Sequence, residues 1–272
     1  MNLLTEIITF PFLQRALVAG FLLGLLLASL GVIATLRKMA FFGEGVAHAS
    51  LAGIAIAIFA GIAPVPFAVL WAVIIAVLIY WLERKTKLPS DTVIGILFTA
   101  SMALGVIIMS FTQGYQPELL SFLFGSILTI QNIDLVVISV SSIMILSWLG
   151  ASLSSLTFLS LSEEAAQVAG INTKLQTLLF YIALAVATVL GVKILGIVLV
   201  SALIVLPPAT SKMLTTSFKN YFIVSIVISE ITILLGLLFS FVYDLPSGAV
   251  IVLVGSFIFV LSAIMNSFSK QN

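Results

Sequence analysis

The sequence predicts an all-α polytopic membrane protein with about nine transmembrane helices, and its composition carries this prediction. Of the 272 residues, 62% are hydrophobic and only 8% are charged, whereas soluble domains carry about 25% charged residues. The mean hydropathy is +1.33. The apolar residues also fall in successive runs of about 20, the length that crosses a bilayer. We therefore expect residues 1–272 to form a single transmembrane domain.

Nine apolar runs meet this length requirement, with charged, glycine- or proline-containing stretches between most of them. The spans are placed near 13–36, 41–60, 64–82, 92–112, 133–151, 175–193, 194–212, 220–242 and 247–266. The stretch PELLSFLFGSILTI, 117–130, is too short and too close to its neighbour to cross independently. It is predicted to be a re-entrant or interfacial helix, which requires burial in protein.

The distribution of lysine and arginine in the short loops predicts the orientation. Alternating nine spans puts the basic loops LRKMA, LERKTKLPSD and SKMLTTSFKN on one side, with the N-terminus outside and the C-terminus in the cytoplasm. Arg15 and Lys193 are the exceptions. An eight-span alternative, in which 41–60 only dips into the membrane, ranks second because it exposes Arg37 and Lys38 outside.

One long polar segment, 154–174, falls on the predicted cytoplasmic side. Ser162 followed by Glu163 and Glu164 is typical of a helix N-cap with acids in the first turn. Gly170 then stands where such a helix would end. A short cytoplasmic helix is expected here, and by pattern alone a docking role and a plain connector are equally open.

Three ionisable residues lie inside predicted spans, where such groups are functional candidates by default. Glu44 and His48 are one helical turn apart and share a face. Their alternative role is a local pair that merely neutralises itself. Gly45, Ala49 and Gly53 recur every four residues beside them, and such faces let helices approach closely.

If the close neighbour is a second copy of this helix, two carboxylates and two imidazoles come together. That set of two nitrogens and two oxygens suits Zn²⁺ and is acceptable to Mn²⁺ or Fe²⁺. A single chain supplies only two ligands. The pattern therefore predicts a transient metal site in a transport pathway, completed by a dimer.

Two further features are candidates for the pathway or for a hinge. Glu230 lies in mid-span and is either a second polar station or, as the favoured interpretation, a buried acid paired with a nearby hydroxyl such as that of Ser225, Ser229 or Thr232. Pro207 and Pro208 interrupt the hydrogen bonding of their span and predict either a hinge or a plain kink.

Other function classes are disfavoured by what the sequence lacks. A net charge of +1 gives no field for nucleic acid, and the absence of cysteine excludes thiol chemistry. There is no G-x-x-x-x-G-K-[ST] phosphate loop, and one histidine supports neither a serine triad nor an H-E-x-x-H metalloprotease. The chain is therefore predicted not to be an enzyme. An ion-coupled secondary transporter using Glu44 and Glu230 is the remaining alternative.

Several stretches together resemble one known family. FFGEGVAHASLAGIAIA is similar to the G-D-x-x-x-H segment of the membrane permeases of bacterial ABC importers for zinc, manganese and iron. The same family is matched, in order along almost the whole chain, by LERKTKLPSDTVIGI, LSFLFGSIL, SEEAAQVAGIN, VKILGIVLVSALIVLPPAT and YDLPSGAVIVLVGSFIFVLS.

This resemblance implies a homodimeric permease of the bacterial plasma membrane, with the type II architecture of the cobalamin and siderophore importers. It implies two partners, a cytoplasmic ATP-binding subunit and an extracytoplasmic metal-binding protein. The metal ligands then fall on Glu44 and His48, with the family's usual Asp replaced by Glu44. The helix that docks on the ATPase falls on the positions Ser162, Glu163, Glu164, Ala165, Ala166 and Gly170.

The resemblance also ranks the transported ion. The segment VAHASLAG is closer to zinc-type than to manganese-type permeases, so zinc is expected first, manganese second and iron third. The metal is expected as substrate, and no permanently bound cofactor is expected.

Overall fold

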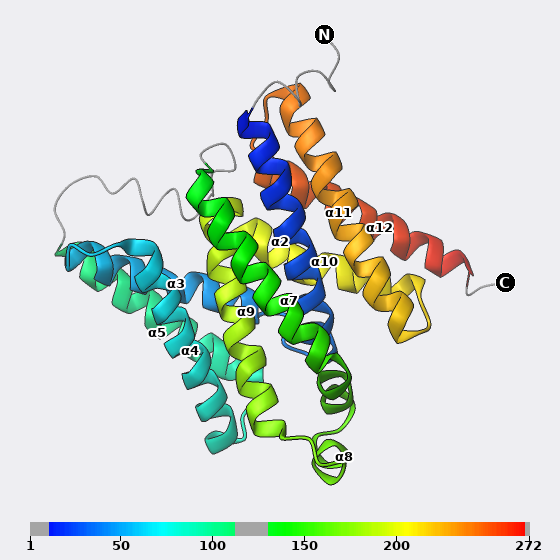
Figure 1. Ribbon diagram of the computed structural model, residues 1–272, viewed down its shortest axis with the longest axis horizontal. Helices are drawn as coiled ribbons and strands as arrows, with labels where there is room; N and C mark the ends of the chain where they lie inside the picture. Colours follow the sequence, from blue (N-terminus) through cyan, green and yellow to red (C-terminus); the bar gives the residue numbers. More distant parts are fainter. Residues whose placement is uncertain (1–10, 112–129, 270–272) are drawn as a thin grey trace.

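The computed structural model describes residues 11–111 and 130–269, and within these ranges the chain is helical throughout (Figure 1). The helices are α2 (Pro11–Leu36), α3 (Phe42–Phe59), α4 (Pro64–Thr86), α5 (Ser90–Ser110), α7 (Asn132–Leu161), α8 (Glu163–Val168), α9 (Thr173–Leu195), α10 (Ile197–Leu214), α11 (Phe218–Tyr243) and α12 (Ser247–Ser269). Over the described residues, nine of them are long and apolar enough to cross a membrane.

The nine-span prediction is confirmed, with one boundary that differs substantially. The span expected at 133–151 continues as α7 to Leu161, for 30 residues. A helix of that length is about 45 Å long, against about 30 Å for the hydrocarbon core. The segment 154–174 therefore starts as an extension of α7. The predicted re-entrant helix, 117–130, lies outside the described residues except for its last one.

The helices differ in how far they are enclosed. Most of α2, α3 and α9 is buried and about half of α10, whereas most residues of α4, α5, α7, α11 and α12 are half-buried or exposed. In Figure 1, α2, α9 and α10 occupy the centre, with α3, α4 and α5 on one side and α11 and α12 on the other. The peripheral helices expose leucine, isoleucine, valine and phenylalanine, as expected for surfaces that face lipid.

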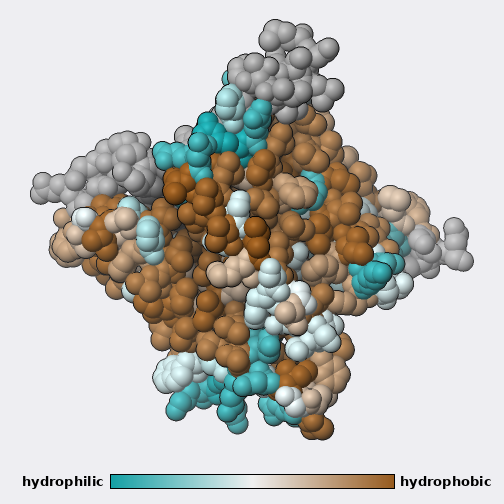
Figure 2. Space-filling model, viewed as in Figure 1, coloured by the Kyte–Doolittle hydropathy of each residue, from teal (hydrophilic) through white to brown (hydrophobic). Residues whose placement is uncertain are grey.

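Polar side chains gather towards the ends of the molecule, and apolar ones cover its middle (Figure 2). Arg84, at the end of α4, forms a salt bridge of 2.8 Å with Glu163 of α8. Arg37, after α2, donates to Thr177 Oγ1 near the start of α9, at 3.4 Å. Two of the basic loops thus lie at the same end as α8, as the alternation of spans predicts.

Lys193, one exception to the charge pattern, has an ion-pair partner within the fold. Lys193, near the end of α9, pairs with Asp134 in the first turn of α7. Asp134 also accepts from the backbone N–H of Gln131 as part of a capping box. The lysine charge at this end is therefore paired within the fold, but Lys193 stays an exception to the orientation pattern, which counts lysine and arginine rather than net charge.

Candidate functional site

The candidate metal ligands lie in the first two turns of α3, where almost everything else is buried. Glu44 is exposed and His48 is half-buried, whereas Gly45–Ala47, Ala49 and Ser50 are buried. Glu44 stands in the first turn, where the helix dipole favours a carboxylate. The sequence thus presents one carboxylate and one imidazole on the open side of an otherwise enclosed helix segment.

His48 is oriented by α5. Its ring lies 5.3 Å from the Phe98 ring, centroid to centroid, at 57°. Its Nδ1 is buried and has no hydrogen-bond partner among the described residues. The nitrogen that remains free to reach the open side is therefore Nε2, the atom through which histidine commonly ligates a metal.

A single chain does not complete a metal site. In the ranges that the structure describes, no group of three or more histidine, cysteine, aspartate or glutamate side chains is placed to hold a metal ion. Glu44 and His48 supply two ligands, and four-coordinate sites need two more. This agrees with the ligand count that the sequence predicts for one chain.

The small-residue face of α3 is used inside the chain, which corrects the expectation that it faces a second copy. A Cβ at Gly45 would collide with Ile94 of α5. A Cβ at Gly53 would lie 2.7 Å from Trp71 Cβ and 3.1 Å from Ala68 Cα, both in α4. These glycines let α4 and α5 approach α3 closely. Any partner must therefore meet α3 on the side of Glu44 and His48.

Glu230 lies in α11 against α2, apart from the α3 pair. Its Oε1 is buried with no hydrogen-bond partner in the part of the chain that the structure describes. The predicted hydroxyl pairing is wrong for two of the three candidates, because Ser225 Oγ donates to Tyr221 O and Ser229 Oγ donates to Gly24 O. The Thr232 hydroxyl is likewise unpaired among the described residues. Among the described residues, Glu230 Oε1 thus has no hydrogen-bond partner, and the acid does not join Glu44 and His48 in a metal cluster.

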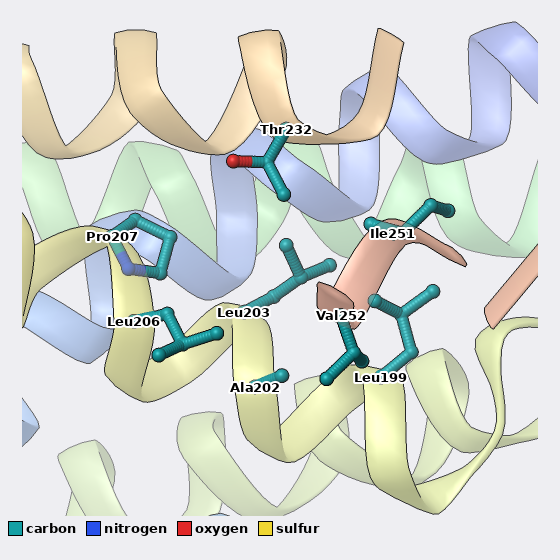
Figure 3. A pocket seen from close by; sticks show the side chains of 8 residues that line it. All are labelled: Leu199, Ala202, Leu203, Leu206, Pro207, Thr232, Ile251 and Val252. Carbon is teal, nitrogen blue, oxygen red and sulfur yellow. The ribbon is translucent and has the colours of Figure 1, made fainter. Parts of the chain in front are cut away.

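The helix α10 continues through Pro207 and Pro208 without a break. Pro207 lines a small apolar pocket between α10, α11 and α12, in which Thr232 carries the one polar side-chain atom that Figure 3 draws in red. The other residues around this pocket are Leu199, Ala202, Leu203, Leu206, Ile251 and Val252. Both prolines are buried, so they are part of the packed core.

The short helix predicted within 154–174 is confirmed as α8, and its ends use the residues that the sequence singled out. Ser162 Oγ accepts from the Ala165 N–H at 3.2 Å. Gly170, at φ +80°, ends the segment, with backbone bonds from Gly170 to Gln167 and from Ile171 to Ala166. That pair of bonds is a Schellman closure. Ala166 is buried, whereas Glu163, Glu164 and Ala165 are exposed.

A buried polar cluster near this end was missed from the sequence. Glu83 accepts hydrogen bonds from Tyr181 Oη at 2.6 Å and from Ser90 Oγ at 2.7 Å. The Arg37 guanidinium lies 5.5 Å from the centre of the Tyr181 ring. Glu83 was counted with the charged residues of the following loop. The position of its carboxylate inside the last turn of a span is the one local feature that distinguishes it.

Comparison with known proteins places the chain among transport proteins. The ABC 3 transport family matches residues 9–266. The high-affinity zinc uptake system membrane protein ZnuB of Haemophilus influenzae is 34% identical over 253 residues, which cover 93% of this chain and 97% of that protein. The manganese transport system membrane protein MntC of Listeria monocytogenes is 29% identical over 262 residues, covering 96% and 93%.

A solved structure has the same fold. A chain of PsaBC from Streptococcus pneumoniae, solved in complex with Fab, superposes with a TM-score of 0.83 at 26% sequence identity, over 95% of this chain and 93% of that one. The match of sequence and of architecture extends over nearly the whole length. This chain belongs to the ABC 3 transport family.

Proposed function

We propose that this chain is the transmembrane permease of an ATP-driven importer for a divalent transition-metal ion. The observation that carries the proposal is the placement of Glu44 and His48 on the open side of α3. An exposed carboxylate and an imidazole with a free Nε2 offer oxygen and nitrogen ligands of borderline softness. Relatives named as zinc and manganese transport proteins support the same class of substrate.

Zinc is the first choice of ion, manganese the second and iron the third. A site built from two glutamates and two histidines suits Zn²⁺ and accepts the other two. Glu44 stands where the family usually has aspartate, and its extra methylene group moves the carboxylate by about one bond length. The metal preference of this chain therefore depends on how the partner copy accommodates the longer side chain.

The assembly that we propose is a homodimer in a bacterial plasma membrane. Its partners are a cytoplasmic ATP-binding subunit, which hydrolyses ATP, and an extracytoplasmic metal-binding protein. The N-terminus lies outside and the C-terminus in the cytoplasm. Residues 1–272 form one permease domain, within which 154–174 is the coupling segment and α8 docks on the ATPase. The permease itself catalyses no reaction.

In the proposed transport cycle, the partners bind the outward-open and inward-open states of the permease with different affinities. The binding protein delivers the ion to Glu44 and His48 of both protomers. ATP binding and hydrolysis move α8, and the two permease halves exchange between outward and inward access. For Pro207 and Pro208 we propose a static role rather than a hinge, because both are buried within the continuous helix α10.

The deciding experiment is uptake of labelled zinc and manganese by cells that express this chain with its ATPase and binding protein. Glu44→Gln and His48→Ala are expected to reach the membrane in normal amounts and to lose uptake. Glu44→Asp keeps the charge and serves as the matched control that retains uptake. Normal uptake by both loss variants would disprove the site. The ion that the wild type accumulates decides the substrate.

A further inference from the structure

A continuous series of side-chain contacts leads from α8 into the membrane domain. Glu163 of α8 forms its salt bridge with Arg84 of α4 at 2.8 Å. The Arg84 guanidinium then lies 5.0 Å from the centre of the Tyr80 ring, one turn back along α4. These two contacts thus connect α8 to the C-terminal end of α4.

The series continues through aromatic side chains to the helix that carries the metal ligands. The Tyr80 ring meets Tyr181 of α9 edge-on, at 6.3 Å and 90°. Tyr181 contacts Phe42 at 5.2 Å, and both side chains are fully buried. Phe42 is the first residue of α3, two residues before Glu44.

Glu83 fixes the centre of this series. Its carboxylate accepts from Tyr181 Oη at 2.6 Å and from Ser90 Oγ at 2.7 Å, so one side chain joins α4, α5 and α9. Hydrogen bonds to an ionised acceptor are the strong ones. The Arg37 guanidinium also lies beside these rings, 5.5 Å from the centre of the Tyr181 ring and 5.8 Å from the centre of the Phe180 ring.

The two ends of this series of contacts differ in how far their side chains are buried. Arg84 and Glu163 are 33% and 50% exposed, and such a pair contributes little to stability. Tyr181 is fully buried among closely packed rings, and packed interiors transmit strain. The ion pair at α8 therefore adds little to the stability of the fold. The buried rings near α3 can pass a movement of α8 on to α3.

We propose that Tyr181 and Glu83 are positioning residues for transport. They hold the first turn of α3, and with it Glu44 and His48, against α4 and α9. They also pass the movement of α8 on to that turn, through Arg84 and Tyr80. The inference rests on the proposed function, in which α8 docks on an ATPase, and it names the connection between the ATPase and the metal site.

The primary test is Tyr181→Phe in the complete complex of permease, ATPase and binding protein, reconstituted in liposomes. This change keeps the ring contacts with Phe42 and Tyr80 and removes only the hydrogen bond to Glu83. Metal transported per ATP hydrolysed is expected to fall by about tenfold, the factor that corresponds to losing one hydrogen bond to a charged group. Assembly stays at the wild-type level, and the melting temperature falls by no more than a few degrees, as expected for the loss of one hydrogen bond. Tyr243→Phe, on an exposed tyrosine at the C-terminal end of α11, is the matched control and leaves the ratio unchanged.

A second variant tests the same connection from its exposed end, where misfolding is not an issue. Arg84→Ala is expected to lower the ratio of metal to ATP, and Arg84→Lys, which can still pair with Glu163, to restore much of it. The double variant with Tyr181→Phe is expected to be no worse than the more severe single one, because coupled residues are not additive. Additive losses, or wild-type ratios in both single variants, would overturn the inference. If Tyr181→Phe does not assemble, the Arg84 pair of variants decides.

Failure of this inference and failure of the proposed function give different results. If the wild-type complex moves no metal, the proposed function is wrong. If the wild type transports and Glu44→Gln does not, while Tyr181→Phe and Arg84→Ala keep the wild-type ratio, only the connection is wrong.

Discussion

The candidate ligands Glu44 and His48 lie on the open side of an otherwise enclosed stretch of α3. The residues between and beside them are buried against α4 and α5, so α3 faces its own chain over most of its first turns. The side that remains carries an exposed carboxylate and a half-buried imidazole. An ionisable pair at this depth is costly in lipid, and a polar or aqueous surrounding on that side removes the cost.

The imidazole makes the site sensitive to pH in a defined direction. A metal binds only the neutral ring, so protons compete with the ion for His48. Below the titration range of the imidazole, the apparent dissociation constant is expected to rise by about a hundredfold for each pH unit, because the proposed dimer site holds two histidines and each must lose its proton. Binding of zinc to the purified permease, without the binding protein, measures this dependence. A profile that stays flat from about pH 8 to pH 5 would contradict ligation by His48.

At the scale of elements, α10 is held to α2 through a glycine. Proline has no N–H, so Pro208 leaves the carbonyl of Ile204 without its helical donor. A Cβ at Gly31 of α2 would collide with that carbonyl oxygen. The bare backbone of α2 therefore packs on the carbonyl that Pro208 frees.

Gly31→Ala is expected to destabilise the protein by about 1–3 kcal/mol, the usual cost of overpacking a core. The contact is backbone to backbone, so side-chain rotation cannot relieve it. Thermal unfolding of the purified protein in detergent measures the change. Gly150→Ala is the control, since a Cβ there meets nothing within 4 Å and alanine is the better helix former. Equal melting temperatures for the two variants would contradict the close approach of α2 and α10.

At the scale of the whole molecule, the helices divide into an enclosed group and a surrounding one. The enclosed α2, α3 and α9 connect the proposed metal ligands to the end where α8 and the basic loops lie. The surrounding helices expose apolar side chains over the middle of the molecule (Figure 2). Because one chain supplies two ligands, the complete site belongs to the proposed dimer.

The absence of cysteine makes the dimer directly testable by cross-linking. Leu51 is half-buried, one turn beyond His48 on the same stripe of α3. Leu51→Cys is expected to form a covalent dimer with an oxidant or a short bis-thiol reagent in native membranes. Phe257→Cys in α12, 63% exposed and on the opposite side of the molecule from α3 in Figure 1, is expected to stay monomeric. A monomeric Leu51→Cys would contradict a two-fold axis beside the ligands.

Much of the fold followed from local properties. The nine spans and the ends of α8 at Ser162 and Gly170 were predictable, because span length and helix capping depend on residues close together in the chain. The continuation of α7 to Leu161 was not. The residues 154–161 are polar enough to form either a loop or an exposed helix, and local pattern does not separate these.

The sequence by itself determined the fold class, the family and the candidate ligands Glu44 and His48, because composition, hydrophobic length and one-turn spacing are properties of the chain alone. Only the tertiary structure decided which side of α3 is open, where the glycines of that helix pack, and that Lys193 is neutralised by Asp134. It alone brought Glu83 to Tyr181, 98 positions apart in the sequence. Contacts between distant segments depend on how the helices pack, and no local pattern encodes them.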